Sequence, residues 1–314
     1  MVDTVLITGG AGFIGSRLAH RLHDAGYEVR LFDNFFRGRR ENVADLVGEP
    51  DVELIRGDVR NYDAVVDAMA GADAVVHLAA ICLNRSVEYP GESLAVNLIG
   101  SNTVFEAAVE TDVDRVLAAS SASVYGDQPI PMAETDRPAP QTPYGTAKIG
   151  LEHLLHFYGN YHDLDYVAYR FFNVYGPGQH TDAYYTSVIN VFIERLLNGN
   201  EPVIHGSGEQ TMDFVHVDDI ARALELGLET ENTREVVNVG SGEMTSITEL
   251  ATELVDIVGA DVEPVYKDRD VVVSERQADT RHAADVLGFT TEVSVRQGLT
   301  DVVEWMKAER DSAN

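Results

Sequence analysis

A strand, a glycine-rich turn and a helix follow one another at the start of the chain, and this order restricts the possible folds most. Residues 4–8 (TVLIT) form a short apolar run that predicts a buried strand, and GGAGFIG follows directly. Ile14, Leu18 and Leu22 then recur at helical spacing, which predicts a helix that ends before Gly26. A strand that enters a helix through such a turn is typical of the first half of a βαβ unit.

The glycines of this turn have the spacing of a dinucleotide-binding fingerprint. Gly9, Gly12 and Gly15 fit G-x-x-G-x-x-G, a pattern that lets the backbone approach a pyrophosphate at the helix N-terminus. The next predicted strand, EVRLFD, ends in Asp33, whose carboxylate can accept hydrogen bonds from the ribose hydroxyls and repels a 2′-phosphate. The pattern therefore favours NAD over NADP. The arginines that follow fit a solvated loop better than a 2′-phosphate site: Arg37, Arg39 and Arg40.

Strand and helix patterns continue to alternate as far as about residue 174. Strands are predicted at 52–58, 73–80, 114–121 and from 165, with helices at 61–70, 92–110 and from 143. Repeated units of this length imply an α/β fold, a Rossmann-type doubly wound parallel sheet with helices on both faces. Ligands of such sheets bind at the carboxyl ends of the strands.

The second half of the chain is less regular. Helices are predicted near 186–198, 217–229, 246–258 and 294–308, and a strand at 236–240. We expect an NAD-binding domain formed by residues 1–174 together with about 211–242. A smaller, partly interleaved substrate-binding domain would comprise about 175–210 and 243–314.

Tyr144 and Lys148 stand four residues apart in a segment with a chemical use. A helix that starts near Pro143 places both side chains on one face, one turn apart. The ammonium group favours the phenolate form of the tyrosine, so that Tyr144 can take a proton from a substrate hydroxyl. Ser121, at the end of the preceding strand, can hold the substrate oxygen. Tyr-x-x-x-Lys also occurs by chance on many helices, so its significance depends on the rest of the chain.

The charge balance excludes two classes of partner. The chain carries 52 Asp and Glu against 23 Lys and Arg, a net charge of −29. Such an acidic surface repels nucleic acid and anionic membranes, so we expect neither as a partner. The composition is typical of proteins from salt-loving organisms, and we expect stability to rise with salt because salt screens the self-repulsion.

Cysteine and histidine usage predicts no metal site and no disulfide. Cys82 is the only cysteine, and the ten histidines lack metal-motif spacing. No apolar run approaches the length of a membrane span, and a first strand at residue 4 leaves no room for a signal peptide. We therefore expect a cytoplasmic protein.

Eight features in this order resemble the extended short-chain dehydrogenase/reductase family, specifically NAD-dependent nucleotide-sugar epimerases of the UDP-glucose 4-epimerase type. The resemblance covers nearly the whole chain. Its features are TGGAGFIG (8–15), Asp33, GDVR (57–60), HLAA (77–80), SSASVYG (120–126), YGTAK (144–148), RFFNVYGPGQ (170–179) and DFVHVDDIARA (213–223).

The resemblance implies a role for each matching residue. Ser121, Tyr144 and Lys148 are similar to the catalytic set of the family. NAD contacts are implied for Gly9, Gly12, Phe13, Ile14, Gly15, Asp33, Asn34, Asp58, Val59, Leu78, Ala79, Ala80, Asn97, Tyr144, Lys148 and Phe171. Substrate contacts are implied for Ser123, Tyr144 and Asn173, with Arg269 and Arg276 as further candidates. Asn97 and Asn173 also fit ordinary helix or loop hydrogen bonds.

The implied reaction is 4-epimerisation of a nucleotide-diphosphate sugar. In the family, the tyrosine takes the O4 proton while hydride leaves C4 for NAD, the 4-keto sugar rotates, and hydride returns to the opposite face. Relatives that dehydrate or decarboxylate resemble this chain but carry an acidic residue just after the catalytic Ser or Thr. This chain has Ala122 and Ser123 there, which favours epimerisation.

Some positions depart from the family pattern. Met212 replaces an arginine that usually pairs with the substrate diphosphate, so Arg269 and Arg276 are candidates to supply that charge. Arg276 also falls near the position that controls whether an N-acetyl sugar fits, where it can restrict the pocket or attract a uronic carboxylate. Arg85 and Ser86 resemble the loop of epimerases that accept N-acetylated or acidic sugars.

Other functions stay open at this point. The resemblance implies a UDP-sugar as the most suitable substrate and a homodimer formed through the helices at 92–110 and 144–159. Alternatives are a dehydrogenase or other extended short-chain enzyme that acts on another nucleotide sugar, such as a UDP-N-acetylhexosamine or a UDP-uronate. A 4,6-dehydratase and a non-catalytic NAD-binding regulator are less favoured.

Overall fold

A seven-stranded parallel sheet forms the centre of the larger lobe. The computed structural model describes residues 2–179, 187–268 and 275–312. In spatial order the strands are β11 (Glu235–Val239), β6 (Asp165–Phe171), β5 (Arg115–Ser121), β4 (Ala74–His77), β1 (Thr4–Thr8), β2 (Glu28–Asp33) and β3 (Val52–Arg56). Every neighbouring pair is parallel. The predicted doubly wound fold is confirmed.

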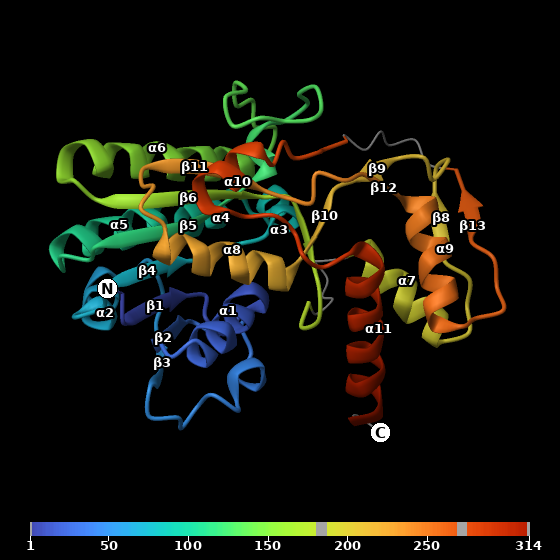
Figure 1. The fold of residues 1–314 in the computed structure, drawn as a ribbon, viewed down its shortest axis with the longest axis horizontal. Helices are drawn as coiled ribbons and strands as arrows, with labels where there is room; N and C mark the ends of the chain where they lie inside the picture. The colour runs from blue at the N-terminus through green and yellow to red at the C-terminus, as the bar shows by residue number, and fades with distance from the viewer. Residues whose placement is uncertain (1, 180–186, 269–274, 313–314) are drawn as a thin grey trace.

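Helices cover both faces of this sheet (Figure 1). One face carries α1 (Phe13–Asp24) and α8 (Val217–Glu229), and the other carries α2 (Tyr62–Met69), α5 (Ser101–Glu110) and α6 (Pro143–His162). Side chains of β1 alternate between the two cores, because Val5 and Ile7 join the α1 side while Leu6 joins the α5 side. A strand buried on both faces is apolar throughout, as TVLIT is.

The segment predicted as a single helix at 92–110 consists of several pieces. It contains α4 (Pro90–Leu94), a π-helical segment η2 (Ala95–Gly100) and α5. The helix α3 (Leu83–Glu88), which precedes α4, was not predicted because six residues carry too little periodicity. A π-helical turn inside a helix often marks a functional region, and here it lies beside the loop that follows β4.

A smaller lobe has its own apolar core. Its helices are α7 (Val188–Leu197), α9 (Ile247–Val258) and α11 (Val295–Ser312), beside the paired strands β8 (Val203–His205) and β13 (Val265–Lys267). Figure 1 shows these elements to one side of the main sheet. Two short ladders connect the lobes: β7 (Asn173–Tyr175) with β10 (Phe214–His216), and β9 (Thr211–Met212) with β12 (Thr245–Ser246).

One helix returns from the C-terminal part of the chain to the larger lobe. The helix α10 (Arg281–Leu287) packs against β11 and α8, and its Ala283 and Val286 belong to the core of the large sheet. The range 243–314, predicted as part of the substrate-binding domain, therefore contains one element of the larger core. Within the described ranges, none of the helices combines the length and apolar character that crossing a membrane requires.

Candidate active site

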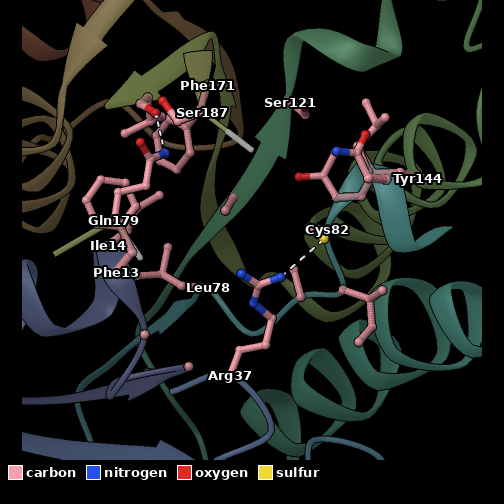
Figure 2. A pocket seen from close by; sticks show the side chains of 18 of the residues that line it. Phe13, Ile14, Arg37, Leu78, Cys82, Ser121, Tyr144, Phe171, Gln179 and Ser187 are labelled. Carbon is pink, nitrogen blue, oxygen red and sulfur yellow. Dashed lines mark hydrogen bonds between the residues drawn. The ribbon is translucent and has the colours of Figure 1, made fainter. Parts of the chain in front are cut away.

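The carboxyl ends of the central strands open into a cavity of about 930 Å³. Its walls run from the glycine turn after β1, past the ends of β2, β4, β5 and β6, to the smaller lobe. Figure 2 shows Phe13 and Ile14 on one side of this space and Tyr144 across from them. Parallel strands whose connections diverge leave a crevice at this edge, which is where the sequence patterns converge.

The glycine turn is packed so closely that side chains are excluded. Gly9 has a φ of 72°, and a Cβ there would lie 2.9 Å from the backbone nitrogen of Ala79. A Cβ on Gly15 would overlap the carbonyl oxygen of Gly9. The helix α1 begins at Phe13 after Gly12, which has no side chain to cap the first N–H groups. The free N–H groups and the open backbone fit a pyrophosphate.

Asp33 ends β2 on the rim of the cavity. Its carboxylate accepts hydrogen bonds from the backbone nitrogens of Ala11 at 3.1 Å and Phe35 at 2.8 Å. Burial raises the pKa of this carboxyl, and the two hydrogen bonds oppose that effect. A Cβ on Gly38 would overlap the carboxylate, so only a glycine lets the backbone approach Asp33 this closely. These features fit the predicted contact with the adenosine ribose.

The arginines near Asp33 have other contacts. Arg37 donates from Nη1 to the Sγ atom of Cys82 at 3.4 Å, which Figure 2 shows across the cavity edge. The backbone nitrogen of Arg39 donates to the Ala11 carbonyl, and the Arg40 guanidinium lies 5.8 Å from the centre of the Phe35 ring. Arg37 and Arg39 line the cavity, whereas Arg40 packs beside it.

Some of the residues predicted to contact NAD lie at the end of the cavity where its adenine is expected. Asn34 and Val59 line the cavity, and so does Arg60. Asp58 lies behind them, where it accepts hydrogen bonds from Arg60 and from the Asn34 amide at 3.0 Å. Arg60 holds the pKa of this carboxyl well below its usual range. Asp58 thus orients two lining side chains, and the contact with NAD predicted for it stays a prediction.

Asn97 has a different position from the one its predicted role requires. Leu78, Ala79 and Ala80 line the cavity, but Asn97 is fully buried behind this loop. Its Oδ1 accepts from the Ile81 nitrogen at 2.7 Å, and its Nδ2 donates to the Ile81 carbonyl at 2.9 Å. We therefore correct the prediction: Asn97 fixes the loop that forms the wall and is not itself part of the wall.

Tyr144 and Lys148 lie one turn apart on α6, as predicted. Pro143 begins this helix, and Thr142 caps it by accepting from the Gly145 nitrogen at 3.1 Å. Lys148 Nζ lies 5.5 Å from the centre of the Tyr144 ring and donates to the Ala119 carbonyl at 2.6 Å. Both side chains line the cavity together with Ser121.

The charge of Lys148 is set by opposing effects. Complete burial lowers the pKa of this ammonium group to about 8, while the carboxylate of Glu152, one turn further along α6, raises it. Arg170 pairs with Glu152 through two hydrogen bonds of 2.9 and 2.7 Å, and Ser120 donates to the same carboxylate. The pairing with Arg170 therefore fixes the position of the Glu152 carboxylate beside the lysine.

Ser121 completes this end of the site. It terminates β5, and its Oγ accepts a hydrogen bond from the Ser123 nitrogen at 3.1 Å. The hydroxyl hydrogen of Ser121 is still available to a substrate oxygen, because a hydroxyl both donates and accepts. The arrangement of a phenol, an ammonium group and a hydroxyl can remove a proton from a bound alcohol and return it.

Residues of both lobes line the part of the cavity where the substrate is expected. Ser123, Asn173 and Arg276 line the cavity, as does Phe171 on the cofactor side, whereas Arg269 lies outside the described residues. Asn173 donates from Nδ2 to the Asp213 carbonyl at 2.9 Å. Further lining residues were not predicted: Cys82, Asn84, Gln179, Val188, Phe192, His205, Gln210 and Ile247. Cys82 and Asn84 follow the end of β4, and this position could have predicted them as cavity residues. The lining residues of the smaller lobe follow no comparable sequence pattern.

Comparisons with known proteins agree with this geometry. The NAD dependent epimerase/dehydratase family matches residues 5–240. A putative UDP-glucose 4-epimerase of Methanocaldococcus jannaschii is 34% identical over 96% of this chain and 98% of its own length. The crystal structure of UDP-glucose 4-epimerase from Thermotoga maritima with UDP-glucose superposes with a TM-score of 0.91 at 34% identity, covering 98% of this chain and 99% of that one.

A second solved structure, MoeE5 in complex with UDP-glucuronic acid and NAD, is 35% identical, with a TM-score of 0.86 over 98% of this chain and all of the other. The names of relatives at 31% identity extend to a dTDP-glucose 4,6-dehydratase and a UDP-glucuronic acid decarboxylase. The protein is thus an NAD-dependent enzyme of nucleotide-sugar chemistry, and its glycine cradle and Asp33 fit that cofactor. The chain belongs to the NAD dependent epimerase/dehydratase family.

Proposed function

We propose that the protein catalyses the 4-epimerisation of a UDP-linked hexose with NAD as a retained cofactor. The observation that supports this most is the meeting of Ser121, Tyr144 and Lys148 at one end of the cavity, where no carboxylate is among the described lining residues. Among the described lining residues, the acidic side chains are Asp33, at the ribose end, and Glu92, which pairs with Arg85. A dehydratase needs a further acid to protonate its leaving hydroxyl.

The proton chemistry rests on Tyr144. The Lys148 ammonium favours the phenolate, which accepts the proton of the sugar hydroxyl, and Ser121 donates a hydrogen bond to the same oxygen. When the sugar carbonyl is reduced again, Tyr144 returns that proton. Lys148 stays in place because its Nζ is anchored to the Ala119 carbonyl.

NAD, when bound, supplies the reversible acceptance of a hydride, which no side chain can provide. Epimerisation also requires that the 4-keto sugar present both faces to the same reaction centre. A cavity of about 930 Å³ that extends into the smaller lobe gives the sugar room to rotate about its diphosphate. Because 4-epimerisation is redox-neutral overall, the reaction would consume no external oxidant.

The direct test is proton NMR in concentrated KCl without added NAD, using UDP-glucose, UDP-N-acetylglucosamine and UDP-glucuronate in turn. We expect the 4-epimer of one of them. Tyr144→Phe should reduce the rate by more than about a hundredfold while NAD stays bound. Product formation only with added NAD, accompanied by NADH, would instead identify a dehydrogenase. Activity of Tyr144→Phe close to that of the wild type would reject the assigned base.

We also propose that the enzyme is a homodimer through the face formed by η2 and α6. Ile99, Phe157 and Tyr161 are 59%, 44% and 77% exposed on these elements, which pack against each other. Large apolar side chains that cluster at a surface are typical of interfaces. Light scattering should give twice the chain mass for the wild type and a monomer for Phe157→Glu.

A further inference from the structure

A half-buried arginine lies in the wall of the cavity beside the proposed catalytic residues. Arg276 reaches Ser123 across 153 residues of sequence, with its Nη1 donating to the serine Oγ at 3.4 Å. Its backbone is held on the C-terminal side, because the Gln277 carbonyl accepts from Met132 and the Ala278 nitrogen donates to Asp213. The backbone that follows Arg276 is therefore fixed beside the cavity.

Arg276 has no ion-pair partner among the residues that the structure describes. Among the residues that the structure describes, no carboxylate lies within the 4.0 Å of an ion pair with this guanidinium, and its buried Nε has no hydrogen-bond partner. Arg170 and Arg222, by comparison, each pair with carboxylates. Burial lowers the pKa of Arg276, with only Asp127 acting in the opposite sense. In a chain with 52 acidic residues, a half-buried arginine that has a buried Nε atom and no carboxylate partner among the described residues suggests a role in binding an anion.

The contact with Ser123 defines which end of the cavity Arg276 serves. Ser123 follows Ser121 by two residues and donates its N–H to the Ser121 hydroxyl. It also lies against the first turn of the Tyr144 helix, since a Cβ on Gly145 would come 2.5 Å from the Ser123 carbonyl oxygen. Arg276 is thus next to the groups that handle the reacting hydroxyl, at the opposite end from Asp33.

We propose that Arg276, assisted by Ser123, forms a subsite for a carboxylate on the reacting hexose, so that the substrate class is a UDP-uronate. This inference rests on the proposed function. The guanidinium offers two nitrogens to the two oxygens of a carboxylate, and a neutral hydroxymethyl group would leave its charge unpaired. Ser123 has a hydroxyl that can donate to the same group once the arginine occupies its lone pair.

Binding measurements in the Tyr144→Phe background, where no sugar is converted, test the subsite. Calorimetry would compare UDP-glucuronate, UDP-glucose and UDP with the parent protein, Arg276→Gln and Arg276→Lys. We expect Arg276→Gln to weaken UDP-glucuronate binding by about tenfold to a hundredfold, the effect of one charge-assisted contact, with lysine in between. UDP-glucose and UDP should bind as before, which also shows that the variants are folded.

The matched control is Arg281→Gln, because the Arg281 side chain is 87% exposed and pairs with Asp279 away from the cavity wall. It should leave all three affinities unchanged. An equal loss for all three ligands in Arg276→Gln would overturn the proposal and assign Arg276 to the diphosphate. UDP-N-acetylglucosamine, titrated separately into the same variants, tests a purely steric role. A gain of its binding in Arg276→Gln without loss of UDP-glucuronate binding would also overturn the proposal, since Arg276 would then only restrict the size of the pocket.

The subsite and the proposed reaction can fail separately. Selective loss of UDP-glucuronate binding supports the subsite even if NMR detects no 4-epimer, in which case only the proposed reaction is rejected. The opposite result is also possible: UDP-glucose gives a 4-epimer, the parent protein does not prefer UDP-glucuronate, and Arg276→Gln does not change UDP-glucuronate binding. That result would support the reaction and overturn the subsite.

Discussion

Replacing Asp213 by asparagine should destabilise the protein more than most single changes. Asp213 is completely buried between the lobes, and its Oδ1 accepts from the nitrogen and the hydroxyl of Ser241, each at 2.7 Å. Its Oδ2 accepts from the nitrogens of Gly242 at 3.0 Å and Ala278 at 2.9 Å. Four donors meet two oxygens, so both oxygens must act only as acceptors.

The structure gives the size of the effect. An asparagine amide oxygen can replace one of the Asp213 oxygens, but its NH₂ group then faces the two donors of the other. Two buried N–H or O–H groups lose their partners at about 1–3 kcal/mol each, so Asp213→Asn should cost about 2–6 kcal/mol. Domains are stable by only about 5–15 kcal/mol, so this loss is a large part of the total.

The assay is urea unfolding in concentrated KCl, followed by two probes. Trp305, the single tryptophan, packs against the core of the smaller lobe and reports on that lobe, while far-ultraviolet circular dichroism reports on the whole chain. Coincident transitions justify a free energy of unfolding. Asp256→Asn is the control, because this exposed carboxylate pairs with Arg296 on the surface and should cost less than about 1 kcal/mol. A loss below about 1 kcal/mol in Asp213→Asn would refute the hydrogen-bond argument.

Three further predictions concern the cofactor, pH and salt. Asp33→Ala should weaken NAD binding at least about tenfold, the value of one hydrogen bond to a charged group, and unchanged affinity by calorimetry would exclude the ribose contact. Activity should fall as pH rises through about 8, because Lys148 then loses its charge. Glu152→Gln should move that fall to lower pH, because the Glu152 carboxylate raises the pKa of Lys148. An unshifted pH profile would show that Glu152 does not influence the pKa of Lys148. The melting temperature should rise with KCl, and a salt-independent melting curve would contradict adaptation to high salt.

The sequence predicted those parts of the fold that depend on neighbouring residues. The glycine turn, the buried strands and the Tyr144–Lys148 spacing each follow from a local period or a local steric requirement. The same reasoning placed Asp33 and Ser121 at strand ends, where the cavity opens. Alternating strands and helices then left few topologies for the large sheet.

Contacts between distant segments were not predictable in the same way. Nothing in the sequence distinguishes an Asn97 that points at a cofactor from one that holds the Ile81 backbone, because the π-helical segment changes which face the residue occupies. The ladders β7–β10 and β9–β12 have two or three residues per strand, too few for a period. The approach of Arg276 to Ser123 joins segments that no local pattern relates.

The cavity has the opposite charge to the rest of the molecule, and this has a consequence for ligand capture. Its described lining holds five basic and two acidic side chains in a chain of net charge −29: Arg37, Arg39, Arg60, Lys148 and Arg276 against Asp33 and Glu92. An anionic UDP-sugar is therefore repelled at long range and attracted at contact. The screening length falls from about 10 Å in 0.1 M salt to about 3 Å in 1 M salt, so added salt removes the repulsion before it removes the contact. Stopped-flow association of UDP should become faster as KCl increases, opposite to ordinary electrostatic steering. A rate that falls with KCl would show that the cavity's own positive field already dominates at a distance.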